Sequence, residues 1–314
     1  MSSKPIVVVG SINIDLVVKS ERLPVPGETI LGGEFRSHPG GKGANQAGAA
    51  ARLGHPVFMI GRVGRDLFGQ ELLGFLGRAG VDTSFVAPSD TTTGTAIITV
   101  TPGGQNSIIV ASGANSEVSP EDLDLARGLI RSASLVLAQL EIPMRTVENL
   151  AEICAEEQVP LVLDPAPAQV LAPELLRTIT WITPNEVEAR QLQSFAGAAS
   201  SPTPKESAEG MLALGARNVV LKLGECGAFL ATAAGLRTAV PAFPVKAVDT
   251  TGAGDAFNGA FAVALARGAE PLEAARFASA VAAISVTRHG ALPSMPAEPE
   301  VDAFLQNRSH MEIA

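Results

Sequence analysis

Cysteine is scarce in this chain, with only Cys154 and Cys226 among 314 residues. The two form neither a Cys-x-x-Cys motif nor a disulfide framework. The four histidines show no metal-ligand spacing with these cysteines either. These features exclude a small disulfide-stapled scaffold and fit the reducing environment of the cytoplasm.

Long apolar runs are also lacking. Met1–Pro5 leads directly into the short apolar run Ile6–Val9, which is too brief for the core of a signal peptide. No uncharged apolar run reaches the roughly 20 residues that a membrane-spanning helix requires. We therefore expect a cytoplasmic protein that has no membrane partner.

Basic residues are outnumbered by acidic ones. Lys and Arg together number 23 against 32 Asp and Glu, which gives a formal net charge of −9. A chain with this balance favours solubility and offers no basic face for nucleic acid or anionic lipid. The expected partners are small molecules.

Short apolar runs alternate with segments of helical periodicity along the chain. The runs predicted as buried parallel strands are Ile6–Val9, Val57–Ile60, Leu135–Ala138, Val159–Leu163, Trp181–Thr183 and Val219–Leu223. The predicted helices are Lys42–Leu53, Leu67–Ala79, Pro120–Arg131, Met144–Glu157, Glu186–Phe195 and Lys205–Leu214, several closed by a glycine (Gly54, Gly80, Gly215). This order predicts an α/β fold with a doubly wound, mostly parallel sheet flanked by helices. Residues 1–314 are expected to form a single domain.

Two segments interrupt the alternation of strands and helices. Residues 14–37 alternate apolar and polar side chains, and residues 95–110 are typical of a hairpin that turns at Pro102–Gly104. Together they predict a small antiparallel β lid. One face of the second segment is wholly apolar and needs a cover, either the substrate or another subunit. We therefore expect a homodimer formed through the lid.

The segment Asp249-Thr-Thr-Gly-Ala-Gly-Asp255 is a glycine turn that leads into the predicted helix Ala256–Ala266. Glycine permits unusual dihedrals and close approach, so the amides of residues 252–254 could converge on an anion at the helix N-terminus. Asp255 would then be placed to accept the proton of a hydroxyl that attacks a bound phosphoryl group. The alternative is a carboxylate that only complements the helix dipole.

A second glycine cluster, Pro39-Gly-Gly-Lys-Gly-Ala-Asn45-Gln46, also opens a predicted helix. It is not a Walker A loop, because no Ser or Thr follows Lys42, and Gln46 breaks the dinucleotide-binding pattern. The loop could contact a polar ligand through its backbone, Lys42 and Asn45, or it could be only a tight strand-to-helix turn.

The segment Ser11–Asp15 follows the first predicted strand, where an open α/β sheet binds ligands at its carboxyl edge. The period of two in an extended segment places Asn13 and Asp15 on one side. These side chains could face a ligand or could supply turn chemistry.

Taken together, Gly40–Asn45 and Asp249–Asp255 resemble the two glycine signatures of the ribokinase-like (pfkB) family of carbohydrate kinases. Four further segments match in order and spacing, so the resemblance spans the chain: Ser11–Asp15, Thr183–Glu188, Lys222–Gly227 and Val286–Ser294. It implies transfer of the γ-phosphoryl group of ATP to the 5-hydroxyl of D-ribose, which gives D-ribose 5-phosphate and ADP. The alternatives are a related kinase for 2-deoxyribose, fructose or a nucleoside, and a sugar-binding regulatory protein without turnover.

The resemblance also implies roles for individual residues. Asp255 would be the catalytic base, and the amides of Gly252, Ala253 and Gly254 would form an anion hole. The implied sugar-binding residues are Asn13, Asp15, Gly41, Lys42, Gly43, Ala44, Asn45, Glu141 and Asp255. The implied ATP-binding residues are Asn185, Glu188, Lys222, Leu223, Gly224, Glu225, Cys226, Gly227, Gly254 and Ser279. Among these, Asn185 and Glu188 would place Mg²⁺ and its waters.

A monovalent cation, expected to be K⁺, is implied as well. Its binding residues would be Asp249, Thr251, Ser285, Arg288, Gly290 and Ser294, several through backbone carbonyls. Some relatives carry Thr in place of Lys222 and His in place of Ser279, so the chain departs from them at two positions along the nucleotide.

Overall fold

The computed structural model describes residues 3–103, 105–197 and 203–309. Its larger sheet has nine strands in the order β13-β12-β11-β10-β9-β8-β1-β4-β5. The strands are β1 (Ile6–Val9), β4 (Val57–Gly64), β5 (Val81–Ser89), β8 (Leu135–Gln139), β9 (Leu161–Asp164), β10 (Trp181–Ile182), β11 (Asn218–Lys222), β12 (Ala228–Thr232) and β13 (Arg237–Val240). All neighbours from β5 to β11 pair in parallel, and only β12 and β13 join antiparallel.

Strand β1 lies at the point where the winding of the sheet reverses. It pairs with β4 on one side and with β8 on the other, because the chain builds β4 and β5 first and then crosses over to β8. Ligands of doubly wound sheets bind at such a switch point, outside the carboxyl ends of the strands. The predicted fold class is confirmed, as are all six predicted parallel strands, with bounds that differ by a few residues.

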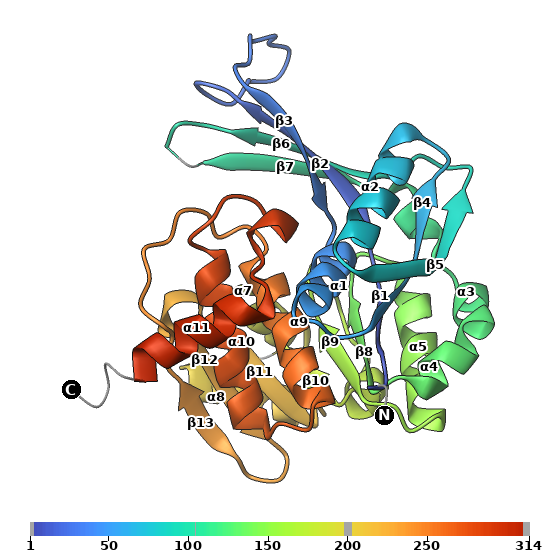
Figure 1. The fold of residues 1–314 in the computed structure, drawn as a ribbon, viewed down its shortest axis with the longest axis vertical. Coiled ribbons are helices and arrows are strands. Elements are labelled where there is room, and N and C mark those ends of the chain that lie inside the picture. Colours follow the sequence, from blue (N-terminus) through green and yellow to red (C-terminus); the bar gives the residue numbers. More distant parts are fainter. Residues whose placement is uncertain (1–2, 104, 198–202, 310–314) are drawn as a thin grey trace.

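Helices cover both faces of the large sheet (Figure 1). They are α1 (Lys42–Arg52), α2 (Leu67–Arg78), α3 (Pro120–Leu125), α4 (Arg127–Ser132), α5 (Met144–Glu156), α6 (Pro173–Thr178), α7 (Glu186–Phe195), α8 (Pro204–Ala213), α9 (Ala253–Ala266), α10 (Pro271–Ser285) and α11 (Glu298–Ser309). The short 3₁₀ turns are η1 (Gly113–Glu117), η2 (Gly224–Cys226) and η3 (Leu292–Ser294).

The two faces of the sheet bury two separate apolar cores. Ile6 and Val8 of β1 point into the core beneath α1, α9 and α10, whereas Val7 and Val9 point into the core beneath α3 to α8. This division follows from the alternation of side chains along a strand. A strand buried on both faces needs a continuous apolar run, which explains the sequence of β1.

Some predicted elements differ from the observed ones. The predicted helix Pro120–Arg131 is divided at Ala126 into α3 and α4, and α9 begins at Ala253 rather than Ala256. The cap glycines behave as predicted, because Gly54, Gly80 and Gly215 all have positive φ. No helix in the described ranges is long and apolar enough to cross a membrane.

The second sheet corresponds to the predicted lid and projects from the body of the molecule (Figure 1). Its order is β3-β2-β6-β7, with β2 (Asn13–Lys19), β3 (Phe35–Gly40), β6 (Gly94–Val100) and β7 (Asn106–Ala111). The β3–β2 and β6–β7 pairs are antiparallel, but β2 and β6 are parallel. Of the predicted hairpin turn, Gly104 lies outside the described residues.

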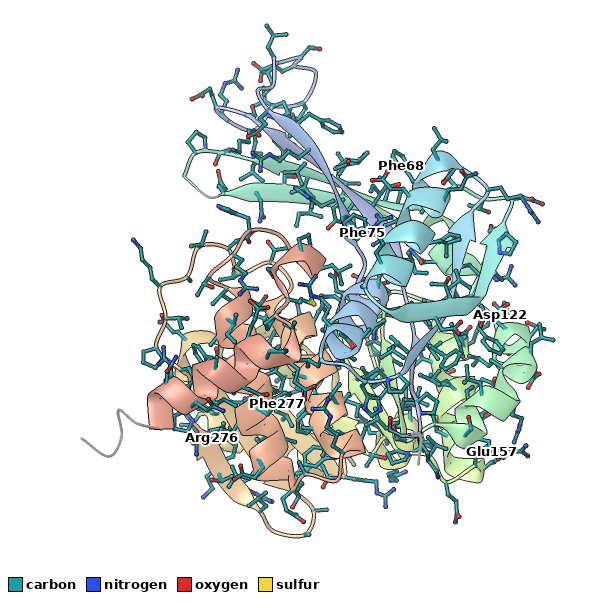
Figure 2. The ribbon with its side chains drawn as sticks, in the orientation of Figure 1. Phe68, Phe75, Asp122, Glu157, Arg276 and Phe277 are labelled. Atoms are coloured by element: carbon teal, nitrogen blue, oxygen red, sulfur yellow. The ribbon has the colours of Figure 1, made fainter. Side chains whose placement is uncertain are left out.

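Apolar side chains of the small sheet remain exposed in the single chain. Ile108, Ile109 and Val110 of β7 are each more than half exposed. Helix α2, which carries Phe68 and Phe75, stands beside the base of this sheet (Figure 2). An exposed apolar strand at a sheet edge is a surface that proteins normally cover.

Candidate active site

The predicted site residues gather at the carboxyl edge of the large sheet. Asn13 and Asp15 follow β1, and Glu141 follows β8. Asn185 follows β10, and Lys222 is the last residue of β11. Because these strands are parallel, their carboxyl ends lie along one edge of the sheet, and side chains far apart in sequence become neighbours.

Asp255 lies in the first turn of α9 and is 6% exposed. The helix begins at Gly252, whose φ of 75° belongs to the left-handed region that favours glycine. A Cβ atom at this position would lie 2.8 Å from the Cβ of Ala291. The turn therefore needs glycine for both its dihedral angle and its space.

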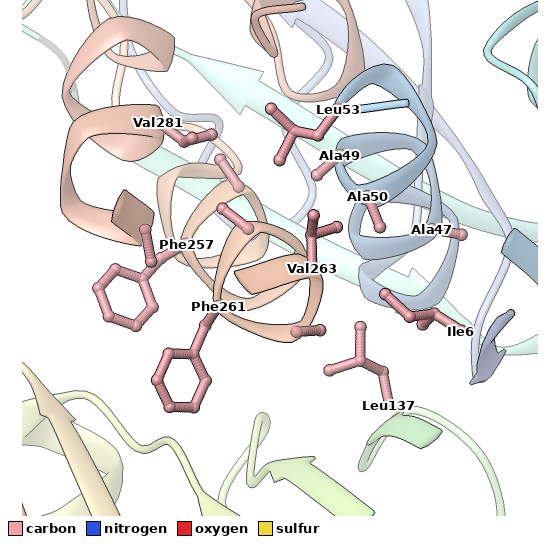
Figure 3. Close-up of a cluster of buried hydrophobic side chains, with 14 of the residues drawn as sticks. Ile6, Ala47, Ala49, Ala50, Leu53, Leu137, Phe257, Phe261, Val263 and Val281 are labelled. Carbon is pink, nitrogen blue, oxygen red and sulfur yellow. The ribbon is translucent and has the colours of Figure 1, made fainter. Parts of the chain in front are cut away.

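Two amide side chains of α1 hold the Asp255 carboxylate. Asn45 Nδ2 donates to Asp255 Oδ2, and Gln46 Nε2 donates to Oδ1, each at 3.0 Å. The helices approach closely at Gly259 of α9, where a Cβ would lie 2.6 Å from the Cβ of Ala49. Figure 3 shows Ala49 and α9 in one packed cluster.

Burial raises the pKa of Asp255 from its ordinary value of 3.8 to about 6. Lys42 and the hydrogen bonds from Gln46 and Asn45 oppose this rise, whereas the nearby charge of Asp164 adds to it. A carboxylate with a pKa near neutrality can both hold and release a proton under working conditions, as a general base must.

Of the amides predicted to form the anion hole, Ala253 N donates to Thr250 O at 3.2 Å. Within the described ranges, the amides of Gly252 and Gly254 have no hydrogen-bond partner. Both lie at the N-terminus of α9, where the helix dipole also favours an anion. The turn can therefore offer two free donors beside Asp255.

Hydrogen bonds fix several of the residues that are predicted to bind the sugar. Asn115 Nδ2 donates to Asn13 Oδ1 at 2.6 Å, which fixes the orientation of the Asn13 amide. Glu141 accepts hydrogen bonds from the Ser11 hydroxyl and, at 3.1 Å, from the amide of Lys42. These contacts hold carboxylate and amide groups in place to bind adjacent hydroxyls.

Burial and neighbouring charges perturb the pKa values of Asp15 and Lys42. Burial, followed by the charges of Glu141 and Asp255, raises the pKa of Asp15 to about 7. Burial would lower the pKa of Lys42, but the carboxylates around it outweigh burial and raise the pKa above its usual value. Lys42 therefore stays protonated among these acidic groups.

A polar chain that the sequence did not predict lies beneath Asp255. Gln139 Nε2 donates to Gln46 Oε1 at 2.8 Å, and Gln46 Nε2 also donates to Asp164 Oδ2 at 3.0 Å. Asp164 accepts a further bond from Lys222 Nζ at 2.8 Å. Gln46 is the last residue of the second glycine cluster, and Gln139 and Asp164 end strands β8 and β9. A search of strand ends for polar residues could have found the latter two.

A cavity of about 660 Å³ lies at the N-terminus of α9, where Ala253 and Gly254 line it. Its lining includes six of the predicted ATP-binding residues: Lys222, Gly224, Glu225, Gly227, Gly254 and Ser279. Leu223 and Cys226 are not among the described residues that line it. Phe243, Val245 and Phe257 add apolar walls. The Oγ of Ser279 is buried and lacks a hydrogen-bond partner among the residues described.

Asn185 and Glu188 form a capping box at the start of α7. Asn185 Oδ1 accepts from Glu188 N, and Glu188 Oε2 accepts from Asn185 N, both at 2.8 Å. Burial raises the pKa of Glu188, while the positive charge of Lys222 opposes the rise. The box uses Oε2, so Oε1 is the oxygen that can face a metal-bound water, the mode of binding that Mg²⁺ prefers. Across the described residues, no cluster of three or more His, Cys, Asp or Glu side chains could enclose a metal.

The two loops predicted to bind a monovalent cation lie side by side. Asp249 Oδ2 accepts from Gly290 N at 2.8 Å, and Asp249 Oδ1 accepts from Thr251 N and Oγ1. The hydroxyls of Ser285 and Ser294 are 2.7 Å apart. The side chain of Arg288 instead points to Glu300, with 2.5 Å between Nη2 and Oε1, so only its backbone could serve the site.

Comparisons with known proteins identify the family of this chain. The pfkB family carbohydrate kinase profile matches residues 3–298. The chain belongs to this family. It is 43% identical to the ribokinase of Bacillus subtilis over 301 residues, which cover 96% of this chain and 99% of that protein.

Two solved structures are also similar to this member of the pfkB family. The ribokinase of Thermotoga maritima is 42% identical, with a TM-score of 0.89 over 96% of this chain and 99% of that one. The ribokinase of Arabidopsis thaliana complexed with ribose and ATP is 36% identical, with a TM-score of 0.88 over 97% of this chain and 99% of that one.

Proposed function

We propose that this chain transfers the γ-phosphoryl group of ATP to the 5-hydroxyl of D-ribose and releases D-ribose 5-phosphate and ADP. The observation that carries the proposal is the position of Asp255. It directly follows Gly254, which lines the large cavity together with Lys222 and Ser279. Its charge also raises the pKa of Asp15, one of the predicted sugar-binding residues. The similarity to ribokinases along nearly the whole chain supports ribose as the sugar.

In the proposed mechanism, Asp255 removes the proton of the sugar hydroxyl as its oxygen attacks the γ-phosphorus in line. The bond from phosphorus to the β,γ-bridging oxygen breaks, and ADP leaves with that oxygen. The free amides of Gly252 and Gly254 stabilise the negative charge on the transferred group. The protonated Lys42 adds positive charge next to Asp255. Most of the rate then comes from positioning and electrostatics.

Mg²⁺, the nucleotide and K⁺ each have residues that could bind them in this mechanism. Mg²⁺ would neutralise charge on the phosphates, with Glu188 and Asn185 holding its waters. The unpartnered Ser279 hydroxyl offers a hydrogen bond to the nucleotide inside the cavity. K⁺ would bind between the Asp249 and Gly290 loops. Their backbone carbonyls suit a weakly hydrated ion better than they suit Mg²⁺, which requires tight octahedral geometry.

The assembly we propose is a homodimer in which the small sheets of two copies cover each other. The exposed Ile108, Ile109 and Val110 of β7 support this arrangement, because each is more than half exposed in one chain. The free thiols of Cys154 and Cys226 are compatible with residence in the reducing cytoplasm. Residues 1–314 would form one kinase domain, with this sheet as its lid.

A coupled ADP-release assay with ribose, 2-deoxyribose, fructose and a nucleoside tests the proposed function. Ribose should give the highest kcat/KM. A higher value for another sugar would reassign the substrate while keeping the kinase activity. Tight ribose binding by calorimetry without ADP release from any sugar would instead indicate a regulatory sugar-binding protein and would overturn the proposal.

A further inference from the structure

A buried ion pair lies between the nucleotide cavity and the catalytic carboxylate. Lys222 at the end of β11 and Asp164 at the end of β9 are joined at 2.8 Å, and their side chains are 13% and 3% exposed. The short strand β10 separates these two strands in the sheet. A buried ion pair of this kind contributes little net stability, because desolvation of both charges offsets their attraction. Another reason for keeping the pair is therefore expected.

Lys222 points to the phosphate-binding turn. Its Nζ lies 3.5 Å from the place that a Cβ atom of Gly254 would occupy, and Lys222 also lines the large cavity. Gly254 supplies one of the two free amides at the N-terminus of α9. A positive charge at this place faces the same anion as the amides, and a lysine ammonium is a usual partner for phosphate.

Asp164 connects Lys222 to Asp255 through the side chain of Gln46. Gln46 Nε2 donates to Asp164 Oδ2 and to Asp255 Oδ1, both at 3.0 Å, while Lys222 binds the other oxygen of Asp164. The four groups therefore form a continuous chain from the cavity to the catalytic carboxylate. A shift of any of these four side chains would change the hydrogen bonds of its neighbours.

We propose that Lys222 is a further catalytic residue, which contacts an oxygen of the transferring phosphoryl group beside Gly254. Asp164 is then the positioning residue that holds Lys222 at this place. Asp164 also shares the hydrogen-bond donor Gln46 with Asp255. The proposal rests on the proposed kinase function. It assigns a role to Asp164. It also adds the positive charge of Lys222 to the phosphate site, next to the backbone amides and Lys42.

Four variants test the role of Lys222: Lys222→Met, Lys222→Arg, Asp164→Asn and the double variant D164N/K222M. Lys222→Met should lower kcat with saturating Mg–ATP and ribose about 10²–10³-fold, as expected when one transition-state charge contact is lost. The KM for ribose should change only a few-fold. Lys222→Arg keeps the charge and should retain more activity than Lys222→Met. Lys205→Met, on the exposed face of α8, is the matched control for the loss of one lysine and should keep wild-type kcat.

The double variant separates catalysis from folding. Each single neutralisation leaves an unpaired buried charge and should lower the thermal midpoint, whereas D164N/K222M removes both charges and should recover most of the midpoint. Its kcat should stay as low as that of Lys222→Met. A double variant that turns over within a few-fold of wild type would overturn the catalytic role of Lys222.

The pH profile tests the link from Asp164 to Asp255. The charged groups around Asp255 are Lys42 on α1, Asp164 on β9 and Asp15 on β2. Asp164→Asn removes one negative charge, so the acid limb of kcat/KM for ribose should move to lower pH. An unmoved limb would show that Asp164 only holds Lys222. Wild-type protein that phosphorylates no sugar would refute the proposed function itself, whereas an active wild type with fully active variants would refute only this inference.

Discussion

Replacement of Asp255 by Asn should make the protein less active and more stable at the same time. The carboxylate is 6% exposed and accepts hydrogen bonds from Asn45 and Gln46. An Asn side chain would turn one accepting oxygen into a donor. The Oδ1 of Asn45 has no partner among the described residues, so a flip of the Asn45 amide would supply the acceptor that the new NH₂ group needs.

The expected stability change follows from the pKa of Asp255. Because this pKa is about 6 in the folded chain against an ordinary 3.8, the folded state binds more protons than the unfolded state between these pH values. Stability therefore falls as the pH rises through this window, and the full penalty is present above pH 6. A rise of this size corresponds to about 3 kcal/mol, which Asp255→Asn should recover at pH 8 and not at pH 4.

The expected loss of activity follows from the proton that Asp255 accepts. Removal of a general base typically lowers kcat by about 10²–10⁴-fold, while ATP and ribose binding should persist. In the wild type, kcat/KM for ribose should fall below about pH 6 and reach about a tenth of its plateau at pH 5, because only the ionised carboxylate accepts a proton. The residual activity of Asp255→Asn should lack this limb.

The measurements are steady-state kcat and kcat/KM for ribose between pH 5 and pH 8.5, and denaturant unfolding at pH 4 and pH 8. Asp302→Asn removes a carboxylate from the exposed surface of α11 and serves as the matched control, which should change neither quantity. Turnover of Asp255→Asn within a few-fold of wild type would show that the carboxylate is structural. A wild-type plateau that extends to pH 5 would contradict the raised pKa.

Three further predictions concern the sugar-binding residues, the glycine turn and the cation. Ribose should be preferred over 2-deoxyribose, because a site built to bind a hydroxyl keeps unpaired groups when the hydroxyl is missing. Asn13→Met should reduce the difference in kcat/KM between the two sugars. Equal kcat/KM for both sugars in the wild type would contradict the assignment of Asn13 to the sugar hydroxyls. Gly252→Ala should destabilise the fold by about 1–3 kcal/mol and lower kcat, since φ is 75° and Ala291 lies 2.8 Å from the new Cβ. Gly268→Ala, with φ of 84° and open space around it, is the control, and equal losses in unfolding measurements would show that contact with Ala291 is unimportant. In tetramethylammonium buffer with saturating Mg–ATP, added KCl should raise kcat more than it lowers the KM for ribose. NaCl is the control for ionic strength. No activation by KCl would refute the cation site.

The sequence by itself determined the features that depend on local geometry. The glycines at positions 54, 80, 215 and 252 mark places where the backbone adopts positive φ, and only local sequence is needed to predict them. The buried runs such as Ile6–Val9 predicted parallel strands, because a strand covered on both faces must be apolar throughout. The two glycine motifs likewise predicted Asp255 and its turn.

The tertiary structure alone decided how these pieces meet. Gln46 reaches Asp255 and Asp164, which are 209 and 118 residues away, only because α1 and α9 pack together over the sheet edge. No local pattern encodes the parallel pairing of β2 with β6 or the ion pair between Lys222 and Asp164. The pKa of Asp255 depends on burial by residues from several elements, so its chemistry arises from the assembled fold, although its identity could be read from the chain.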